Sequence, residues 1–88
     1  AMNRKQLFRR LCQGALHNVA FDDMVNLVEG FGFRLARVSG SHHIFRHRLT
    51  GTKLNLQPYR GQAKPYQISQ FLGLVEQLNL TMDAEDEE

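Results

Sequence analysis

The hydrophobic residues of this 88-residue chain recur first at helical spacing, then alternate with polar residues, and finally return to helical spacing. Apolar positions three and four residues apart predict amphipathic helices, whereas alternation at every second residue predicts half-buried strands. The pattern predicts helices over residues 3–13 and 21–29, and a last helix that begins at Lys64-Pro65. Asn3 is a candidate cap of the first helix, and Gly30-Phe31-Gly32 is expected to end the second.

Three short strands are predicted between the last two helices, over residues 33–38, 42–48 and 53–57. Pro58 is expected to end the third strand, and residues 59–63 to form a polar loop. The order helix–helix–strand–strand–strand–helix predicts an α+β two-layer sandwich with a three-stranded antiparallel sheet. Without the first helix, the order is the α-β-β-β-α order of double-stranded-RNA-binding domains.

The alternation within the strands leaves open which face of the sheet covers the core. In the second strand, His42 shares a face with Ile44, whereas His43 shares the opposite face with Phe45. The first strand also carries apolar residues on both faces. Phe45 is expected in the core, and His47 is expected at the surface or in the hairpin.

The last helix is predicted to bury one apolar stripe against the sheet. This stripe consists of Ile68, Phe71, Leu72, Val75 and Leu78. Gly73 interrupts the same helix, where glycine costs about 1 kcal/mol relative to alanine. Close packing of Gly73 against the sheet is the expected reason for its presence.

The length of the chain is that of one domain, which we expect to span residues 1–82. Residues 83–88 hold five of the nine acidic residues and are expected to form a disordered tail. The domain keeps all 11 Lys and Arg against four acids, a balance of 11 − 4 = +7. A domain this basic indicates a polyanionic partner, with nucleic acid the first candidate. The alternative is a solvated surface that is simply basic.

The single cysteine, Cys12, excludes an internal disulfide and fits a reducing, cytoplasmic location. Thiolate pairs and helically spaced histidine pairs are absent from the sequence, so we do not expect a structural metal. No apolar run approaches the roughly 20 residues of a membrane span, and no signal peptide is visible, so no membrane association is expected.

The segment Gly40-Ser41-His42-His43-Ile44-Phe45-Arg46-His47 holds three of the four histidines. Imidazole exchanges protons near neutral pH. RNA carries its own nucleophile, the 2′-hydroxyl, so its cleavage needs a base, an acid and cations around the phosphate. One histidine beside a basic surface supplies much of this chemistry, and a glycine–serine pair lets a phosphate approach backbone N–H groups. A hydrogen-bonded surface residue is the commoner role of such a histidine.

Three segments resemble the HicA family, also called YcfA-like, of small toxins in bacterial type II toxin–antitoxin pairs. They are Gly40-Ser41-His42-His43-Ile44-Phe45-Arg46-His47, Leu54-Asn55-Leu56-Gln57-Pro58 and Lys64-Pro65-Tyr66-Gln67-Ile68. The Phe21-Asp22-Asp23 helix followed by Gly32-Phe33 fits a longer variant of the family. The most specific element is the G-S-H-H string at a strand start, and the similarity covers about residues 4–79.

The resemblance implies an mRNA interferase of the stress response that cleaves RNA without a metal or other cofactor. It also implies a double-stranded-RNA-binding-like fold and a HicB-type antitoxin as the partner. The family's catalytic histidine directly follows the glycine–serine pair and is His42 here. The doubled histidine keeps His43 as the second choice, because a one-residue slip exchanges the two faces. Gly40 and Ser41 would form the turn and offer donors to phosphate. The candidate RNA-binding side chains are Arg37, Arg46 and Lys64, followed by Arg60 and Lys53.

Two other functions stay open from the sequence. The first is a non-catalytic RNA-binding module of the same fold, which binds phosphate with a strong salt dependence but never cleaves. The second is a protein whose basic face docks an acidic binder. No second catalytic residue stands out in the sequence.

Overall fold

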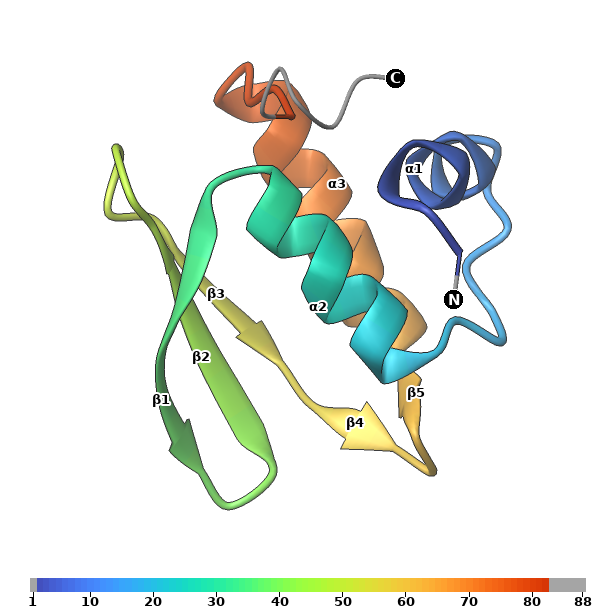
Figure 1. Ribbon diagram of the computed structural model, residues 1–88, viewed down its shortest axis with the longest axis horizontal. Coiled ribbons are helices and arrows are strands. Elements are labelled where there is room, and N and C mark those ends of the chain that lie inside the picture. Colours follow the sequence, from blue (N-terminus) through green and yellow to red (C-terminus); the bar gives the residue numbers. More distant parts are fainter. Residues whose placement is uncertain (1, 83–88) are drawn as a thin grey trace.

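Three helices and two antiparallel β-sheets form the part of the chain that the computed structural model describes, residues 2–82 (Figure 1). In chain order the elements are α1 (Arg4–Cys12), α2 (Phe21–Gly30), β1 (Phe33–Ser39), β2 (His42–His47), β3 (Lys53–Leu56), β4 (Pro58–Tyr59), β5 (Gln62–Ala63) and α3 (Pro65–Gln77). The predicted α-α-β-β-β-α order is confirmed, and β4 and β5 add a second, two-stranded sheet. Residues 83–88, predicted to form an acidic tail, lie outside the described residues.

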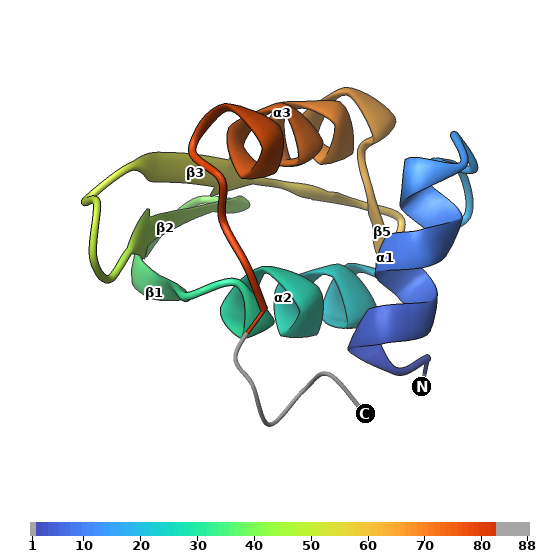
Figure 2. The same cartoon turned by 90° about the horizontal axis from the view of Figure 1, so that it is seen from above.

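Helices α2 and α3 cover one face of the sheet, in which the strand order is β1-β2-β3 (Figures 1 and 2). Helix α1 packs against α2 and lies farther from the sheet. We call the face of the sheet toward α2 and α3 the covered face, and the opposite face the open face. The architecture is therefore the predicted α+β two-layer sandwich.

The helix ends follow the local signals in the sequence. The Asn3 side-chain oxygen accepts a hydrogen bond from the Gln6 backbone N–H at 2.8 Å, so Asn3 caps α1 as predicted. Pro65 occupies the first turn of α3, where its missing N–H is harmless. Gly30 is still helical, and the chain turns at Gly32, whose φ of +95° favours glycine.

The covered face carries the apolar side chains that the core needs. Phe33, Phe45, Leu54 and Leu56 are each at most 2% exposed. Aromatic rings extend this layer toward α1, since the Phe31 ring lies 5.4 Å from the Phe71 ring and 4.9 Å from that of Phe8. The expected place of Phe45 in the core is confirmed, and the covered face is thereby fixed.

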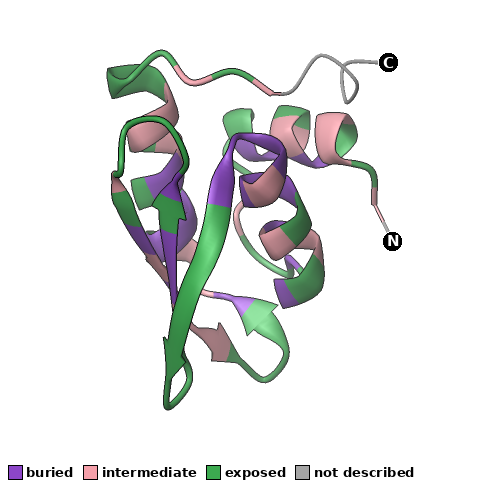
Figure 3. Ribbon diagram, turned by 60° about the vertical axis from the view of Figure 1, so that its left-hand side comes forward, coloured by how far each residue is buried: buried purple, intermediate pink, exposed green. Residues whose placement is uncertain are grey.

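A β-bulge in β1 corrects the simple alternation expected for this strand. Leu35 pairs with Phe45 and Arg37 pairs with Ile44, so Ala36 is an extra residue between two registered pairs. From Arg37 onward each side chain therefore points to the face opposite to the one that strict alternation predicts. This change moves Arg37 to the open face. Figure 3 shows that β1 is exposed beyond its buried first residue.

The segment after β3 is not the polar loop that the sequence pattern predicts. Strands β4 and β5 pair as a short hairpin, in which Pro58 lies opposite Ala63. The segment before α2 continues this small sheet, because the Ala63 N–H donates to the Val19 carbonyl at 2.9 Å. The Phe21 N–H also donates to the Gly61 carbonyl at 2.9 Å. The hairpin thus ties the start of α2 to the start of α3.

The buried residues of the last helix differ from the predicted stripe at Gln67, within α3, and at Leu78, which follows the last residue of α3. Leu78 is 37% exposed, whereas Gln67 is buried and its amide oxygen accepts from the Gln57 backbone N–H at 2.7 Å. The packing expected of Gly73 is wrong, because a Cβ added there would meet no atom within 4 Å. Glycine in an exposed helix interior costs about 1 kcal/mol relative to alanine, and packing does not account for that cost here.

Candidate functional site

The open face of the sheet concentrates positive charge. From Gly30 to Val75 the sequence contains no Asp or Glu. Arg34 lies directly opposite Arg46, which lies directly opposite Lys53, so three cations form one row across the sheet. We call this the cationic row. Like charges directly opposite one another destabilise a sheet, and this arrangement is suited to an anionic ligand that would relieve the repulsion.

His42 lies on this open face, at the start of β2. It is exposed, and it pairs with Ser39 of β1. Its ring Nδ1 lies 3.1 Å from the Asn55 amide nitrogen of β3. An amide nitrogen only donates, so in this arrangement Nδ1 accepts and Nε2 is left facing away from Asn55.

The turn before His42 is held by a chain of polar side chains. Gly40 and Ser41 form a two-residue connection between β1 and β2, and the φ of +61° at Gly40 favours glycine. The Gln57 amide donates to the Ser41 hydroxyl oxygen at 2.8 Å. The Lys64 ammonium donates to the Gln57 amide oxygen at 3.0 Å. Lys64 is therefore fixed close to the residue that precedes His42.

His43 points to the covered face, because its strand neighbour His42 points to the open one. It is half-buried, and its ring lies 4.9 Å from the Phe21 ring in an edge-on arrangement. Nδ1 lies 3.1 Å from the Ser41 carbonyl, which only accepts, so Nδ1 carries the proton. The two adjacent histidines thus hold different tautomers on opposite sides of the sheet.

His47 is buried at the base of the β2–β3 hairpin, so its expected place at the surface is wrong, whereas its expected place in the hairpin is confirmed. It is 7% exposed, and Nε2–H donates to the Phe31 carbonyl at 2.8 Å. Nδ1 accepts from the backbone N–H groups of Leu49 and Thr50 at 3.2 and 3.3 Å. A Cβ at Gly32 would come within 2.8 Å of Nε2, so glycine makes room for the ring.

The predicted RNA-binding residues do not all lie equally near His42. Arg37 pairs with Ile44, two residues along β2, which corresponds to about 7 Å of strand. Arg46 and Lys53 share a row four residues along, at about 13 Å. Arg60 is separate: it lies in the β4–β5 turn, with its guanidinium 5.3 Å from the centroid of the Tyr59 ring. Arg37 and Lys64 are thus the predicted cations nearest the histidine.

Three open-face residues received no role from the sequence: Arg34, Asn55 and Gln57. Arg34 belongs to the cationic row by its register, and its guanidinium donates to the carbonyls of Glu29 and Phe33 at 2.9 and 2.8 Å. The two amides contact His42 and Ser41. Alternation along the third strand already places Asn55 and Gln57 on one face with Lys53. This alternation was the signal in the sequence, but only the pairing of β3 with β2 shows that the shared face is also the face of His42.

Residues 2–82 show neither a metal-binding cluster nor a helix that could span a membrane. No group of three or more His, Cys, Asp or Glu side chains in this part of the chain is arranged to hold a metal ion. No helix in this part is long and apolar enough to span a bilayer.

Comparison with protein families gives one match. The family model described as the HicA toxin of bacterial toxin–antitoxin systems matches residues 21–80, more than half of the chain. The match begins at the first residue of α2 and includes the whole sheet and α3, so α1 lies outside it. Comparisons with curated proteins and with solved structures give no significant match.

Proposed function

The chain belongs to the HicA toxin family of bacterial toxin–antitoxin systems, and on that premise we propose that it is an mRNA interferase. In this proposal it cleaves mRNA without a metal cofactor, and His42 is the general acid–base group. One observation carries the choice of His42: among the three histidines of β2, it is the one on the cationic open face. His43 and His47 both point toward the covered face.

The proposed reaction is an in-line transesterification. The 2′-oxygen attacks the adjacent phosphorus as its proton passes to a base, and the bond from phosphorus to the 5′-oxygen breaks. The 5′-oxygen gains a proton, so the products are a 2′,3′-cyclic phosphate and a 5′-hydroxyl with no change in oxidation state. His42 Nε2 exchanges one of these protons, and general acid–base catalysis of this kind contributes about 10²–10⁴-fold.

Asn55 suits a histidine that gains and loses a proton. Its Oδ1 is buried and has no hydrogen-bond partner within residues 2–82. If the amide rotates by 180°, Oδ1 accepts from Nδ1–H, and Nε2 then carries a lone pair and serves as the base. The same Nδ1–H···Oδ1 contact persists in the imidazolium. Asn55 is therefore a positioning residue in this proposal.

The cations support the same site. Arg37 and Lys64 lie nearest His42 and are proposed to hold the scissile phosphate, with Gly40 and Ser41 offering turn donors to it. The cationic row is proposed to bind a phosphate farther along the strand. Arg60 is proposed for more distant contacts only.

The proposed partner is a HicB-type antitoxin that neutralises the toxin in the cytoplasm. A binder with acidic side chains would complement the open face and exclude RNA from it. The protein encoded by a neighbouring reading frame, added at an equimolar amount, should suppress cleavage. Suppression that persists at high salt after neutralisation of the open-face cations would contradict this mode of binding.

The growth assay is the first test of the proposed function. Expression of the wild-type chain in bacteria should arrest growth, and His42→Ala should abolish the arrest. His17→Ala is the matched control, because His17 is exposed in the connector between α1 and α2. Equal arrest by wild type and His42→Ala would contradict the role of His42.

Purified protein gives the second test. It should cleave single-stranded RNA in the presence of EDTA and leave 2′,3′-cyclic phosphate ends. A strict requirement for a divalent metal would overturn the mechanism. Salt-sensitive RNA binding without any cleavage product would instead identify a non-catalytic RNA-binding module.

A further inference from the structure

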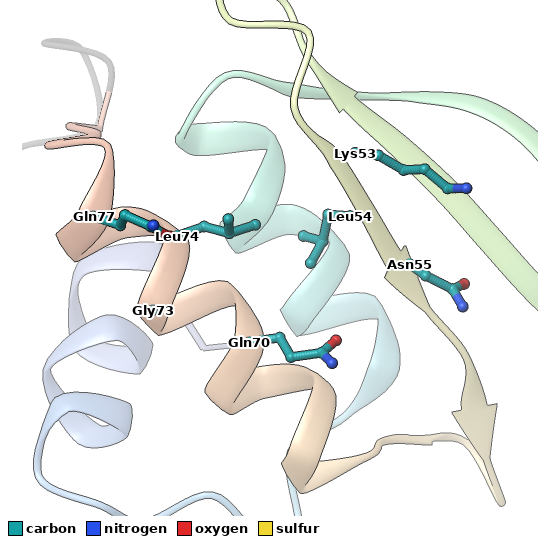
Figure 4. A pocket seen from close by; sticks show the side chains of 7 residues that line it. All are labelled: Lys53, Leu54, Asn55, Gln70, Gly73, Leu74 and Gln77. Carbon is teal, nitrogen blue, oxygen red and sulfur yellow. The ribbon is translucent and has the colours of Figure 1, made fainter.

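A pocket of about 330 Å³ lies where α3 passes the free edge of β3 (Figure 4). Strand β3 is the last strand of the β1-β2-β3 sheet, and no strand within residues 2–82 pairs with its outer edge. The pocket is lined by Lys53, Leu54, Asn55, Gln70, Gly73, Leu74 and Gln77. We call it the β3–α3 pocket.

Gly73 leaves one wall of the β3–α3 pocket without a side chain. It is exposed, lies in the middle of α3, and would have an open space around an added Cβ. Its φ is not in the left-handed region, so the backbone does not require glycine there. Neither packing nor backbone conformation explains why position 73 is glycine. Access to the pocket explains it, because any side chain at position 73 would project into the pocket.

The lining combines apolar and amide groups. The partly buried Leu74 provides the apolar contact surface, because Leu54 is 2% exposed and contributes little accessible area. Gln70 and Gln77 are exposed, and each presents an amide with both donors and an acceptor. Asn55 lines the pocket as well, but its amide nitrogen contacts His42 and its Oδ1 is buried. The chemistry is that of a site for a flat, polar-edged ring, since amide side chains pair with the donor and acceptor edges of nucleobases.

The β3–α3 pocket adjoins the proposed catalytic residue. Asn55 lines the pocket, and its amide nitrogen is also 3.1 Å from His42 Nδ1. Figure 4 shows Lys53 and Asn55 pointing from β3 away from α3, while Leu54 points toward the helix. Lys53 and Asn55 therefore border the pocket on the side of the open face.

We propose that the β3–α3 pocket binds one nucleobase of the RNA, from a nucleotide next to the cleaved phosphate. The pocket would then set the base preference of cleavage. This inference rests on the proposed function for its role in cleavage, but the binding of a base is measurable without cleavage.

The direct test uses the full ¹⁵N-labelled chain and the four nucleoside 5′-monophosphates as probes. The side-chain NH₂ signals of Asn55, Gln70 and Gln77 should shift with at least one of the four nucleotides. Ribose 5-phosphate is the control, because it carries the phosphate and sugar without a base. The proposal is overturned if no nucleotide shifts these signals, or if ribose 5-phosphate shifts them equally.

The variant Gly73→Leu distinguishes loss of nucleotide binding from loss of folding. Leucine should fill the pocket and abolish the nucleotide-induced shifts, while its better helix propensity raises Tm by about 3–8 °C. Ser69→Leu is the control on the same helix, since Ser69 is exposed and does not line the pocket. Unchanged nucleotide-induced shifts in a folded Gly73→Leu protein would overturn the proposal.

Cleavage of a long RNA separates this inference from the proposed function. Gly73→Leu should lower kcat/KM by about tenfold or more, or change the bases at the cleavage sites, whereas Ser69→Leu should do neither. Shifts in wild type with no cleavage by any protein would refute the proposed function but not base binding. Cleavage with identical sites and rates in Gly73→Leu would refute the pocket alone.

Discussion

Histidines on the two faces of the β1-β2-β3 sheet have different surroundings. On the covered face, His47 uses both ring nitrogens in contacts to backbone groups, and His43 packs against the Phe21 ring. On the open face, His42 is exposed and contacts a single amide, among arginine and lysine side chains. Of the three rings, only that of His47 has both nitrogens in hydrogen bonds within residues 2–82, so His42 and His43 differ in the face they occupy and in exposure rather than in the number of contacts.

The comparison extends to charge. The covered face is apolar, and the histidines there hold the strand to α2 and to the hairpin that follows β2. The open face sets like charges opposite one another, at a cost to the sheet. The covered face therefore forms the core, whereas the open face carries like charges, of which the Arg34 and Arg46 guanidiniums donate to backbone carbonyls.

The largest expected effect comes from exchanging the two adjacent histidines for alanine in turn. His42→Ala should lower kcat for RNA cleavage by about 10²–10⁴-fold with little change in Tm, because His42 is exposed. His43→Ala should lower Tm through the lost contact with Phe21 and leave more of the activity. Kinetics and thermal unfolding of both variants check this. Loss of cleavage in His43→Ala alone would assign the catalytic role to His43 instead of His42.

The covered face gives the next largest effect, on stability. His47→Ala should lower the free energy of unfolding by about 3 kcal/mol, because it leaves a cavity and deprives the buried Phe31 carbonyl of its donor. Urea unfolding measures it, with His17→Ala as the exposed control. A loss below about 1 kcal/mol would mean that water replaces the ring without difficulty.

A smaller effect is expected from the amide that orients His42. Asn55→Ala should lower kcat by about tenfold, which corresponds to roughly 1.4 kcal/mol and to one hydrogen bond. Asn55→Asp should retain more activity than Asn55→Ala, because a carboxylate also accepts from Nδ1–H. Single-turnover cleavage rates of the two variants test this expectation. Equal losses in both would show that orientation of the ring is unimportant.

The smallest effect is expected from the cationic row. Arg46→Gln should raise the free energy of unfolding by about 0.2–1 kcal/mol, since it removes the centre of the like-charge row. The same variant should lower the salt slope of RNA binding by about 1. Arg9→Gln on α1 is the control, because Arg9 is exposed and belongs to neither face. A drop in stability would show that the Arg46 contact to the Gly51 carbonyl outweighs the repulsion.

The sequence predicted the elements and their order because each depends on residues close in the chain. Asn3 caps α1 and Pro65 begins α3 through local backbone chemistry. The apolar residues of α2 become core through helical spacing alone. The charge of the domain and the G-S-H-H segment indicated the family and the strand that carries the proposed site.

Side-chain direction could not be predicted in the same way, because it depends on contacts between distant segments. The bulge at Ala36 places Arg37 on the open face, and only the pairing with β2 shows it. The burial of His47 depends on the Phe31 carbonyl, 16 residues away along the chain. The open surroundings of Gly73 depend on how α3 passes β3.

The sequence by itself thus determined the α+β order, the basic domain and the family. The tertiary structure alone decided which of two adjacent histidines lies on the open face. The physical reason is the period of a strand: neighbouring side chains always point to opposite faces, and only the helices packed against the sheet determine which face is covered.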